Sequence, residues 1–342
     1  MTPSTGKGTT LDNWGLLGHE WAVDMLKQHI THDSVRHAYL FSGPPGLGRR
    51  TLALRLAKAL NCPQPVAPGQ PCGTCKTCQQ IERMQYADLA VIQAEKEGGT
   101  LRVDPIRAIR QSLVLTPYQG NYRVALFLRF QEANANAANA LLKTLEEAPA
   151  YAVLVLTADS PEQLLPTIAS RCEVLRLRPL PVESVEAYLL EHGAEPTHAR
   201  LLAHISGGRP GYALHLMQDK DPLEFRTQRL EELQTLLQSN RRARFAYAGK
   251  LTERKNEGKE HPRETLLLWL SFWRDVLLCR AGAETPLVNV DCTQAIERLA
   301  GRLALAEAHR LVAAAEGALD QLERNVNLRL LTEVLLLDWP RG

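Results

Sequence analysis

A glycine-rich turn near the start of the chain has the residue types and spacing of a phosphate-binding loop. The turn and the residues after it supply Gly43, Gly46, Gly48, Arg49, Arg50 and Thr51. A working P-loop binds phosphate with backbone N–H groups, places a Lys at the outer phosphates and uses a Ser or Thr for Mg²⁺. Here Arg49 stands at the Lys position and Arg50 at the hydroxyl position. Because arginine offers only hydrogen-bond donors, it cannot ligate magnesium.

The strand that should carry the acids of such a site ends without them. A P-loop enzyme needs one acid for the magnesium shell and usually a second acid that orients the attacking water. The candidate strand, 124–128, is followed by Arg129-Phe-Gln131, and Glu132 comes only after them. Two independent losses argue against ATP hydrolysis by this chain. They leave open whether the loop still holds an idle ATP or ADP.

Four cysteines gather in one short stretch, at Cys62, Cys72, Cys75 and Cys78. Four thiolates suit a tetrahedral structural zinc site, which has no open position for catalysis. An iron–sulfur cluster is the alternative, since closely spaced cysteines also hold clusters. Disulfides are less favoured in the cytoplasm. Residues 61–80 interrupt the alternation of strands and helices, which predicts a zinc module inserted into the first domain.

The composition limits the class of protein. The chain has 342 residues, 45% of them hydrophobic, and a formal charge of +2. This balance gives no global field that would draw the chain onto nucleic acid. Its first ten residues lack the apolar core of a signal peptide, and no apolar run approaches the ~18 residues of a membrane span. We therefore expect a cytoplasmic protein with no membrane association.

One basic run falls in the last third of the chain. It contains Arg241, Arg242, Arg244, Lys250, Arg254, Lys255 and Lys259. Few aromatic residues are interleaved with these charges, as they would be in many nucleic-acid surfaces. A solvated helix face is therefore the favoured interpretation over contact with DNA.

The pattern of apolar residues predicts three domains. Short buried strands at 39–41, 88–92, 122–128, 152–157 and 173–177 alternate with helices at 51–60, 103–113 and 134–147, which predicts a parallel α/β sheet. A helix with Trp21, Met25, Leu26 and Ile30 on one packed face precedes them. We expect an α/β domain at 1–178, a small helical lid at 179–220 and an all-α domain at 221–342.

Three runs carry a family resemblance, namely 139–147 (NALLKTLEE), 156–161 (LTADSP) and 167–172 (TIASRC). They resemble the AAA+ subunits of the bacterial DNA polymerase III clamp loader. With the cysteines and the altered loop, the chain is most similar to the delta-prime type and less to the ATP-hydrolysing type. The resemblance is strong over 14–216. Beyond that it rests on helical character and on 325–331.

The resemblance implies roles for single residues. In Ser170-Arg171-Cys172 it implies that Arg171 is an arginine finger that reaches the ATP of a neighbouring subunit. Thr157 matches a phosphate-sensing position, and it implies only a structural role here. Gly211 stands where active relatives have a lid arginine, although the nearby Arg209 keeps that alignment open.

The resemblance also implies partners and an assembly. It implies a hetero-oligomer with ATPase subunits and a delta subunit, joined through a C-terminal collar domain, which acts on a sliding clamp and on primed DNA through the assembled complex. Two other readings of the residues remain. One is an active clamp-loader ATPase that uses Arg49 in place of Lys. The other is a zinc-dependent DNA-binding protein on an AAA+ scaffold, which the near-neutral charge disfavours.

Overall fold

The computed structural model describes residues 13–256, 261–324 and 326–340. These residues form two compact units. The first holds the chain up to Leu180 together with Arg209–Tyr212, and the second holds the rest. Among the described residues, none of the helices combines the length and the apolar character needed to cross a bilayer.

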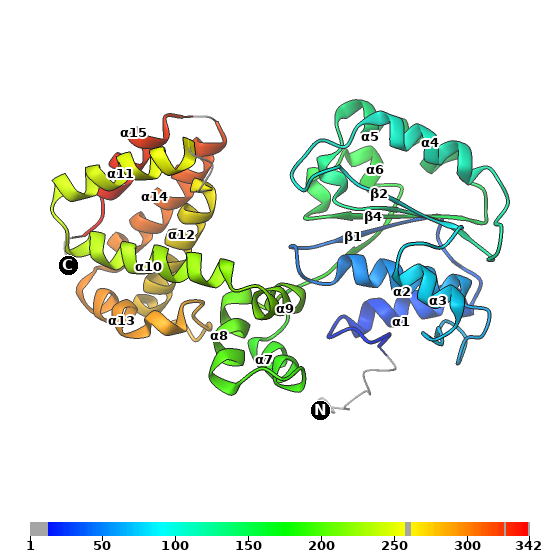
Figure 1. Ribbon diagram of the computed structural model, residues 1–342, viewed down its shortest axis with the longest axis horizontal. Coiled ribbons are helices and arrows are strands. Elements are labelled where there is room, and N and C mark those ends of the chain that lie inside the picture. Colours follow the sequence, from blue (N-terminus) through cyan, green and yellow to red (C-terminus); the bar gives the residue numbers. More distant parts are fainter. Residues whose placement is uncertain (1–12, 257–260, 325, 341–342) are drawn as a thin grey trace. The chain divides into compact units, whose positions relative to one another are not determined.

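A parallel sheet of five strands organises the first unit within the described residues (Figure 1). The strands are β1 (Ala38–Ser42), β2 (Leu89–Ile92), β3 (Arg123–Phe127), β4 (Ala152–Ala158) and β5 (Glu173–Arg176), in the spatial order β2-β3-β4-β1-β5. Every residue of β1 and β4 is buried, as expected for the centre of a sheet that is covered on both faces. Because Ser42 pairs with Ala158, the chain leaves β1 and β4 at neighbouring points.

Helices cover both faces of this sheet. The helices α1 (Glu20–Thr31), α2 (Arg49–Asn61) and α3 (Lys76–Glu82) lie on one face, whereas α4 (Val103–Leu113), α5 (Ala135–Glu147) and α6 (Pro166–Ala169) lie on the other (Figure 1). Two short 3-10 helices follow strands, η1 (Phe130–Glu132) after β3 and η2 (Pro161–Gln163) after β4. The phosphate loop therefore leads into a helix on one face, and Arg171 follows a helix on the opposite face.

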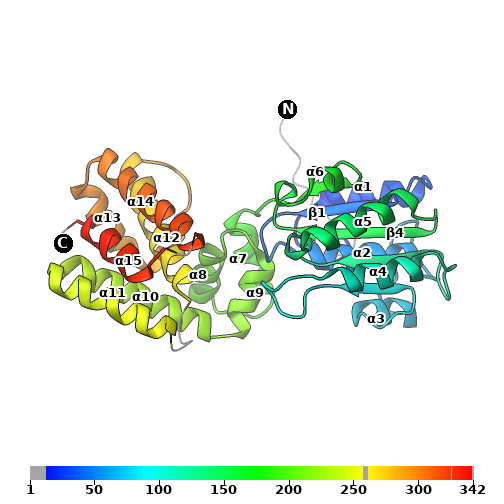
Figure 2. The same ribbon diagram turned by 90° about the horizontal axis from the view of Figure 1, so that it is seen from above.

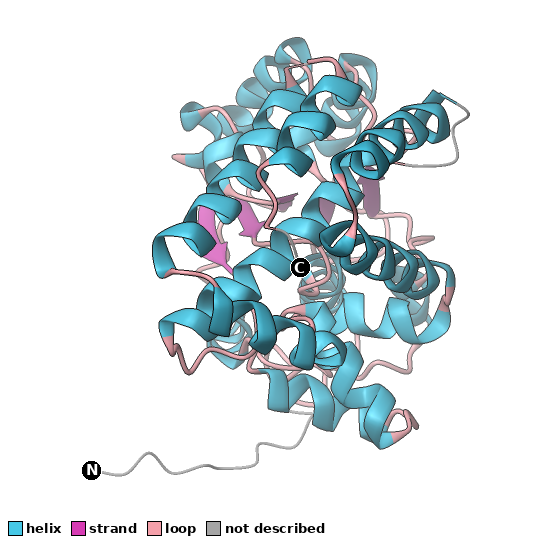
Figure 3. Ribbon diagram, turned by 90° about the vertical axis from the view of Figure 1, so that its left-hand side faces the viewer, coloured by secondary structure: helices cyan, strands magenta, loops and turns pink. Residues whose placement is uncertain are grey.

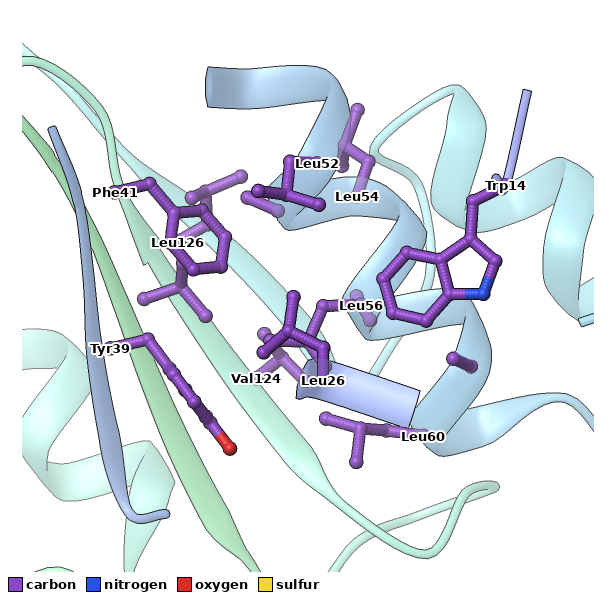
Figure 4. Packing of buried hydrophobic residues seen from close by; sticks show 14 of the residues in the cluster. Trp14, Leu26, Tyr39, Phe41, Leu52, Leu54, Leu56, Leu60, Val124 and Leu126 are labelled. Atoms are coloured by element: carbon purple, nitrogen blue, oxygen red, sulfur yellow. The ribbon is translucent and has the colours of Figure 1, made fainter. Parts of the chain in front are cut away.

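The alternation of side chains along β1 builds the two cores. Tyr39 and Phe41 point toward α2 and contribute to the cluster shown in Figure 4. Ala38 and Leu40 belong to the cluster under α4, α5 and α6. Burying one large apolar side chain stabilises the fold by about 1.5–3 kcal/mol, so this strand ties both helical layers to the sheet.

The remainder of the chain has no strand among its described residues (Figure 3). Its helices are α7 (Val182–Glu191), α8 (Pro196–Ser206), α9 (Pro210–Gln218), α10 (Asp221–Gln238), α11 (Arg241–Asn256), α12 (Pro262–Ala281), α13 (Thr293–Arg302), α14 (Leu305–Glu323) and α15 (Leu328–Leu337), with η3 (Val290–Cys292) before α13. The helices α12 and α14 pack side by side (Figure 2). Trp269 and Trp273 of α12 meet Trp339 edge-on, with ring centroids 4.9 and 5.5 Å apart.

The predicted fold class is confirmed, because a parallel α/β sheet domain precedes a region made only of helices. The helix predicted at 103–113 has those bounds. The helix α3 begins at Lys76, within the stretch 61–80 that was predicted as an insertion, because the sulfur of Cys75 accepts the N–H of Cys78 and caps its first turn. The division into three domains at 178 and 220 stays a prediction.

The packed face predicted for the first helix is wrong at Trp21. This side chain is 50% exposed, whereas Ala22, Val23 and Leu26 are buried. Met25 and Ile30 pack against the same core as Leu26, so Trp21 alone of the four predicted residues lies off the packed face. Adjacent positions on an α-helix differ by about 100°, so a single step moves a large side chain from core to solvent.

Candidate functional site

The predicted phosphate loop does connect a buried strand to a helix. It runs from the end of β1 to the start of α2, and its three glycines have positive φ angles of 143°, 88° and 89° at Gly43, Gly46 and Gly48. The N–H of Gly43 donates to the carbonyl oxygens of Ala158 (3.2 Å) and Asp159 (3.1 Å). The predicted order of strand, loop and helix is therefore present, and part of the hydrogen bonding of the loop backbone is made within the chain.

Gly46 is held by a backbone contact from the segment Arg209–Tyr212. The N–H of Gly211 donates to the carbonyl oxygen of Gly46 at 2.8 Å. A Cβ atom added at Gly46 would lie 2.8 Å from the Cβ of Tyr212, and one added at Gly211 would lie 2.9 Å from the oxygen of Gly46. Close backbone contact thus fills the place where the alignment puts a lid arginine, so a side chain at position 211 does not fit this arrangement.

Arg49 points to a carboxylate of its own chain. Its Nη1 lies 2.8 Å from Oδ1 of Asp159, and its side chain is only 8% exposed. The strand register brings the pair together, since Asp159 follows β4 and Arg49 follows the loop after the adjacent β1. Arg50 is exposed, and its Nη2 lies 3.4 Å from the sulfur of Met84. The position of the P-loop lysine therefore holds an internal ion pair.

The end of β3 also pairs its charges internally. Arg129, with a left-handed φ of 49°, places its Nε 2.9 Å from Oε1 of Glu132. The same carboxylate oxygen accepts the N–H of Gly98 at 2.9 Å. Thr157 accepts the N–H of Arg129 at 2.9 Å, which ties the ends of β3 and β4 together. The acid nearest to the expected catalytic position is thus engaged by an arginine, and Thr157 has a structural contact.

Arg171 lies just after α6, on the sheet face opposite to α2. Its Nη2 lies 2.8 Å from Oε1 of Glu146, and its Nη1 donates to the carbonyl oxygen of Thr167 at 2.9 Å. Its side chain is 38% exposed. Of its flanking residues, Ser170 donates to Thr167 at 3.3 Å. Burial raises the pKa of the Cys172 thiol to about 12, so this sulfur is a neutral packing group.

The four predicted cysteines converge to form a candidate metal centre. The sulfurs of Cys62, Cys72, Cys75 and Cys78 all lie within 4.8 Å of one another. Three of their separations are 3.5, 4.0 and 4.0 Å. A tetrahedron with metal–sulfur bonds of about 2.3 Å has sulfur–sulfur edges of about 3.8 Å, so the spacing fits a four-sulfur metal site.

Backbone donors favour the thiolate of Cys72, whereas burial raises the pKa of the Cys62 and Cys78 thiols. The N–H groups of Cys72, Cys75 and Cys78 each donate to the preceding cysteine sulfur of the site at 3.4 Å. The bond from the Cys75 N–H is the main reason why the pKa of Cys72 falls to about 6. Gly73 turns the chain between two of the ligands with a φ of 75°, a conformation that side chains rarely adopt. These residues could hold a metal ion, and they leave no open coordination position.

The solvated face predicted for the basic run is wrong at Arg244. This side chain is buried, and its guanidinium donates to carbonyl oxygens at the ends of two helices, those of Leu236, Leu237, Leu336, Trp339 and Pro340. Carbonyl groups at a helix end lack partners within the helix, and a fork of five N–H donors can satisfy several of them. Arg241, Arg242, Lys250 and Lys255 are exposed, and Lys259 lies outside the described residues.

Sequence reasoning missed the partners of the two key arginines. Asp159 stands two residues after Thr157, inside a run that carried the resemblance, yet its role appears only from the strand register. Glu146 is an exposed residue near the end of the run 139–147, which carried the resemblance. Its contact with Arg171 joins residues 25 positions apart, which no local pattern reports.

Comparisons with known proteins cover nearly the whole chain. Family models described as DNA polymerase III, delta subunit, and as the C terminal of that subunit match residues 18–181 and 221–341. The DNA polymerase III subunit delta' of Bacillus subtilis is 31% identical over 320 residues, which cover 94% of this chain and 95% of the relative. This chain belongs to the DNA polymerase III delta-prime family. The Pseudomonas aeruginosa member of the family is 34% identical, with 89% of this chain and 91% of that protein covered.

Similarity outside the family is narrower or more distant. The subunit tau of Escherichia coli is 34% identical over 208 residues, which make up 59% of this chain and 32% of tau. A crystal structure of a DNA polymerase III gamma subunit-related protein from Thermotoga maritima is 19% identical with a TM-score of 0.45, covering 93% of this chain and 99% of that one. By sequence, the two delta-prime relatives are matched over more than 90% of their length, whereas tau is matched over 32% of its length.

Proposed function

We propose that this chain is a non-hydrolysing subunit of a DNA polymerase III clamp loader. It completes the ATP site of a neighbouring ATPase subunit with Arg171, and it helps the assembly place a sliding clamp on primed DNA. The observation that carries the proposal is the contrast between two arginines. Arg49 is buried and paired with Asp159 inside the chain's own loop, whereas Arg171 is partly exposed.

Three features of the loop speak against hydrolysis in cis. The guanidinium of Arg49 already neutralises a carboxylate, so a phosphate would have to displace Asp159 from a largely buried ion pair. The acid closest to the end of β3, Glu132, is engaged by Arg129. At Gly211 a backbone contact replaces the lid arginine. A nucleotide bound here would lack the lysine, a magnesium hydroxyl ligand and a free acid.

Arg171 has the chemistry that a neighbour's ATP site needs. A guanidinium beside the transferring phosphoryl group stabilises the charge that builds up in the transition state, and another subunit can supply it. The two contacts of Arg171 use one N–H of Nη1 and one of Nη2. The remaining N–H groups of its guanidinium are sufficient for a bidentate contact with phosphate oxygens.

The cysteine cluster fits a structural zinc ion held by Cys62, Cys72, Cys75 and Cys78. When bound, zinc supplies a four-way cross-link and no reactive position. Cys62 follows the last residue of α2, and Cys78 lies in α3. The metal would therefore fasten the end of the loop helix to its neighbour on the same face of the sheet.

Assembly with ATPase and delta subunits is supported by an apolar stripe on α15. Leu330, Val334 and Leu337 are spaced by four and three residues, so they share one face, and all three are exposed. The opposite face of the helix packs in the core. The double variant L330E/V334E should lose assembly with the sibling subunits in light scattering while the melting temperature of the chain is kept. An unchanged assembly mass would remove this support.

The proposal as a whole is tested with the purified chain and with the reconstituted assembly. Alone, the chain should hydrolyse ATP no faster than a buffer blank, and titration calorimetry with Mg²⁺ and ATP should show no tight site. Mixed with the ATPase and delta subunits, it should enter a complex of defined mass and raise DNA-stimulated ATP hydrolysis. Robust turnover by the chain alone, abolished in Arg49→Ala, would instead establish it as an active ATPase.

A further inference from the structure

Glu146 lies at a position where a carboxylate does not stabilise its own helix. It lies in the last turn of α5, beside Glu147, and that turn has no basic residue. The C-terminal end of a helix carries a partial negative charge, which disfavours acidic side chains there. Helix stability therefore gives no reason for the two glutamates, and their partners have to be sought in other elements.

Each of the two glutamates meets an arginine from another part of the fold. Oε1 of Glu146 lies 2.8 Å from Nη2 of Arg171, and Oε2 of Glu147 lies 3.2 Å from Nη2 of Arg110. All four side chains are partly or largely exposed, and ion pairs of this kind contribute little to stability. The two pairs are thus closely matched in position and chemistry, but only one of them holds Arg171.

The contact with Glu146 fixes the guanidinium of Arg171 from a second side. Thr167 accepts one N–H through its carbonyl oxygen, and Glu146 accepts another, so α6 and α5 hold different nitrogens of the same plane. An arginine side chain has many rotamers in solution, and two anchors on a planar fork set both its direction and its tilt. A guanidinium has five N–H donors, so donors remain for a phosphate while both anchors stay in place.

The geometry points to Glu146 as a positioning residue for Arg171. This inference rests on the proposed role of Arg171 at a neighbour's ATP site. Glu146 touches neither nucleotide nor metal in this scheme and acts only through the guanidinium. Misplacing a stabilising group by about 1 Å costs up to about 100-fold in rate, and Thr167 still holds one nitrogen of Arg171, so we expect the loss of this anchor to cost about tenfold.

The test uses the reconstituted assembly with sliding clamp and primed DNA. Its readout is the finger-dependent ATPase rate, defined as the part of the DNA-stimulated rate that Arg171→Ala removes. E146A should lower this part about tenfold through kcat and leave KM for ATP unchanged. E146Q should keep it within about twofold, because an amide oxygen still accepts the N–H of Arg171. The matched control E147A should keep the full rate.

A double variant separates positioning from a general structural effect. Adding E146A to R171A should lower the rate no further, because the only group that Glu146 acts through is then absent. Melting temperatures of the isolated E146A and E147A chains should agree within a degree. A full finger-dependent rate in E146A, or equal losses in E146A and E147A, would overturn the inference and leave the finger standing. An unchanged rate in R171A would overturn both the finger and the role of Glu146.

Discussion

The predicted phosphate loop and the segment around Arg171 each contain an ion pair between an arginine and a carboxylate, and the two pairs differ in burial. In both, an arginine nitrogen lies 2.8 Å from a carboxylate oxygen. The Arg49 side chain is 8% exposed and the Arg171 side chain 38% exposed. A buried guanidinium that loses its partner leaves an uncompensated charge, whereas an exposed one is solvated by water. Burial, and not distance, therefore distinguishes Arg49, which is fixed in its own fold, from Arg171, which serves a neighbour under the proposed function.

The largest effect on a measured rate is expected from a change at Arg171. Arg171→Ala should lower turnover at the neighbouring ATP site by about 10³-fold, the lower end of the range for arginine fingers. The free energy of unfolding of the isolated chain should change by less than about 0.5 kcal/mol, because both side chains of the Arg171–Glu146 ion pair are partly exposed. DNA-stimulated ATP hydrolysis and chemical denaturation measure the two quantities. A large loss of stability with unchanged hydrolysis would reverse the comparison between the two arginines.

Removal of the metal should destabilise only the face of the sheet that α2 and α3 cover. The metal would close a chain segment of about 15 residues, and closing a loop of that length stabilises a fold by about 3 kcal/mol in the chain-entropy treatment. Chelation, or Cys75→Ser, should therefore lower the melting temperature and speed amide exchange at the end of α2 and in α3. Exchange in α5 and α6 should stay unchanged. Zinc is identified by elemental analysis of the purified chain, and iron in its place would favour a cluster.

A smaller effect is expected when the buried arginine loses its partner. Asp159→Ala should lower the free energy of unfolding by about 2 kcal/mol, less than a fully buried pair because Asp159 is partly solvated. ATP hydrolysis by the reconstituted assembly should stay at the level of the unchanged protein. Glu162→Gln, which breaks an ion pair between two well-exposed side chains, is the control and should leave the denaturation midpoint where it is. Equal midpoints for the two variants would show that Arg49 is not anchored by Asp159.

Much of the sheet domain could be predicted from the sequence, because its signals are local. The strands and the helix at 103–113 alternate over short stretches of sequence. The spacing of the glycines predicts the loop, and the spacing of the cysteines predicts the candidate metal centre. Trp21 shows where a local signal falls short. Its spacing relative to Leu26 and Ile30 suits one helix face, but the angle at which the helix meets the sheet decides which neighbour is buried.

The contacts of the charged side chains could not be predicted from sequence patterns, because each contact joins separate elements of the fold. Arg49 and Asp159 are 110 positions apart, and Arg244 reaches carbonyl oxygens more than 90 positions away. Arg244 sits in a run of basic residues and shares its composition with exposed neighbours. Only the packing of α11 against α15 distinguishes it. A run of basic residues that predicts a solvated helix face can thus contain one buried side chain, which here joins the ends of two helices.

The smallest effect, no gain at all, is expected when the loop sequence is repaired. The double variant R49K/R50T restores a lysine and a hydroxyl at the P-loop positions. It should still hydrolyse no ATP when purified alone, because Glu132 remains engaged by Arg129 and the contact of Gly211 with Gly46 still fills the place of a lid arginine. A phosphate-release assay with the isolated variant is sufficient. Measurable turnover would show that two residues alone distinguish this loop from a working P-loop. The loop would then be an ATPase site inactivated by two substitutions and not a structural element.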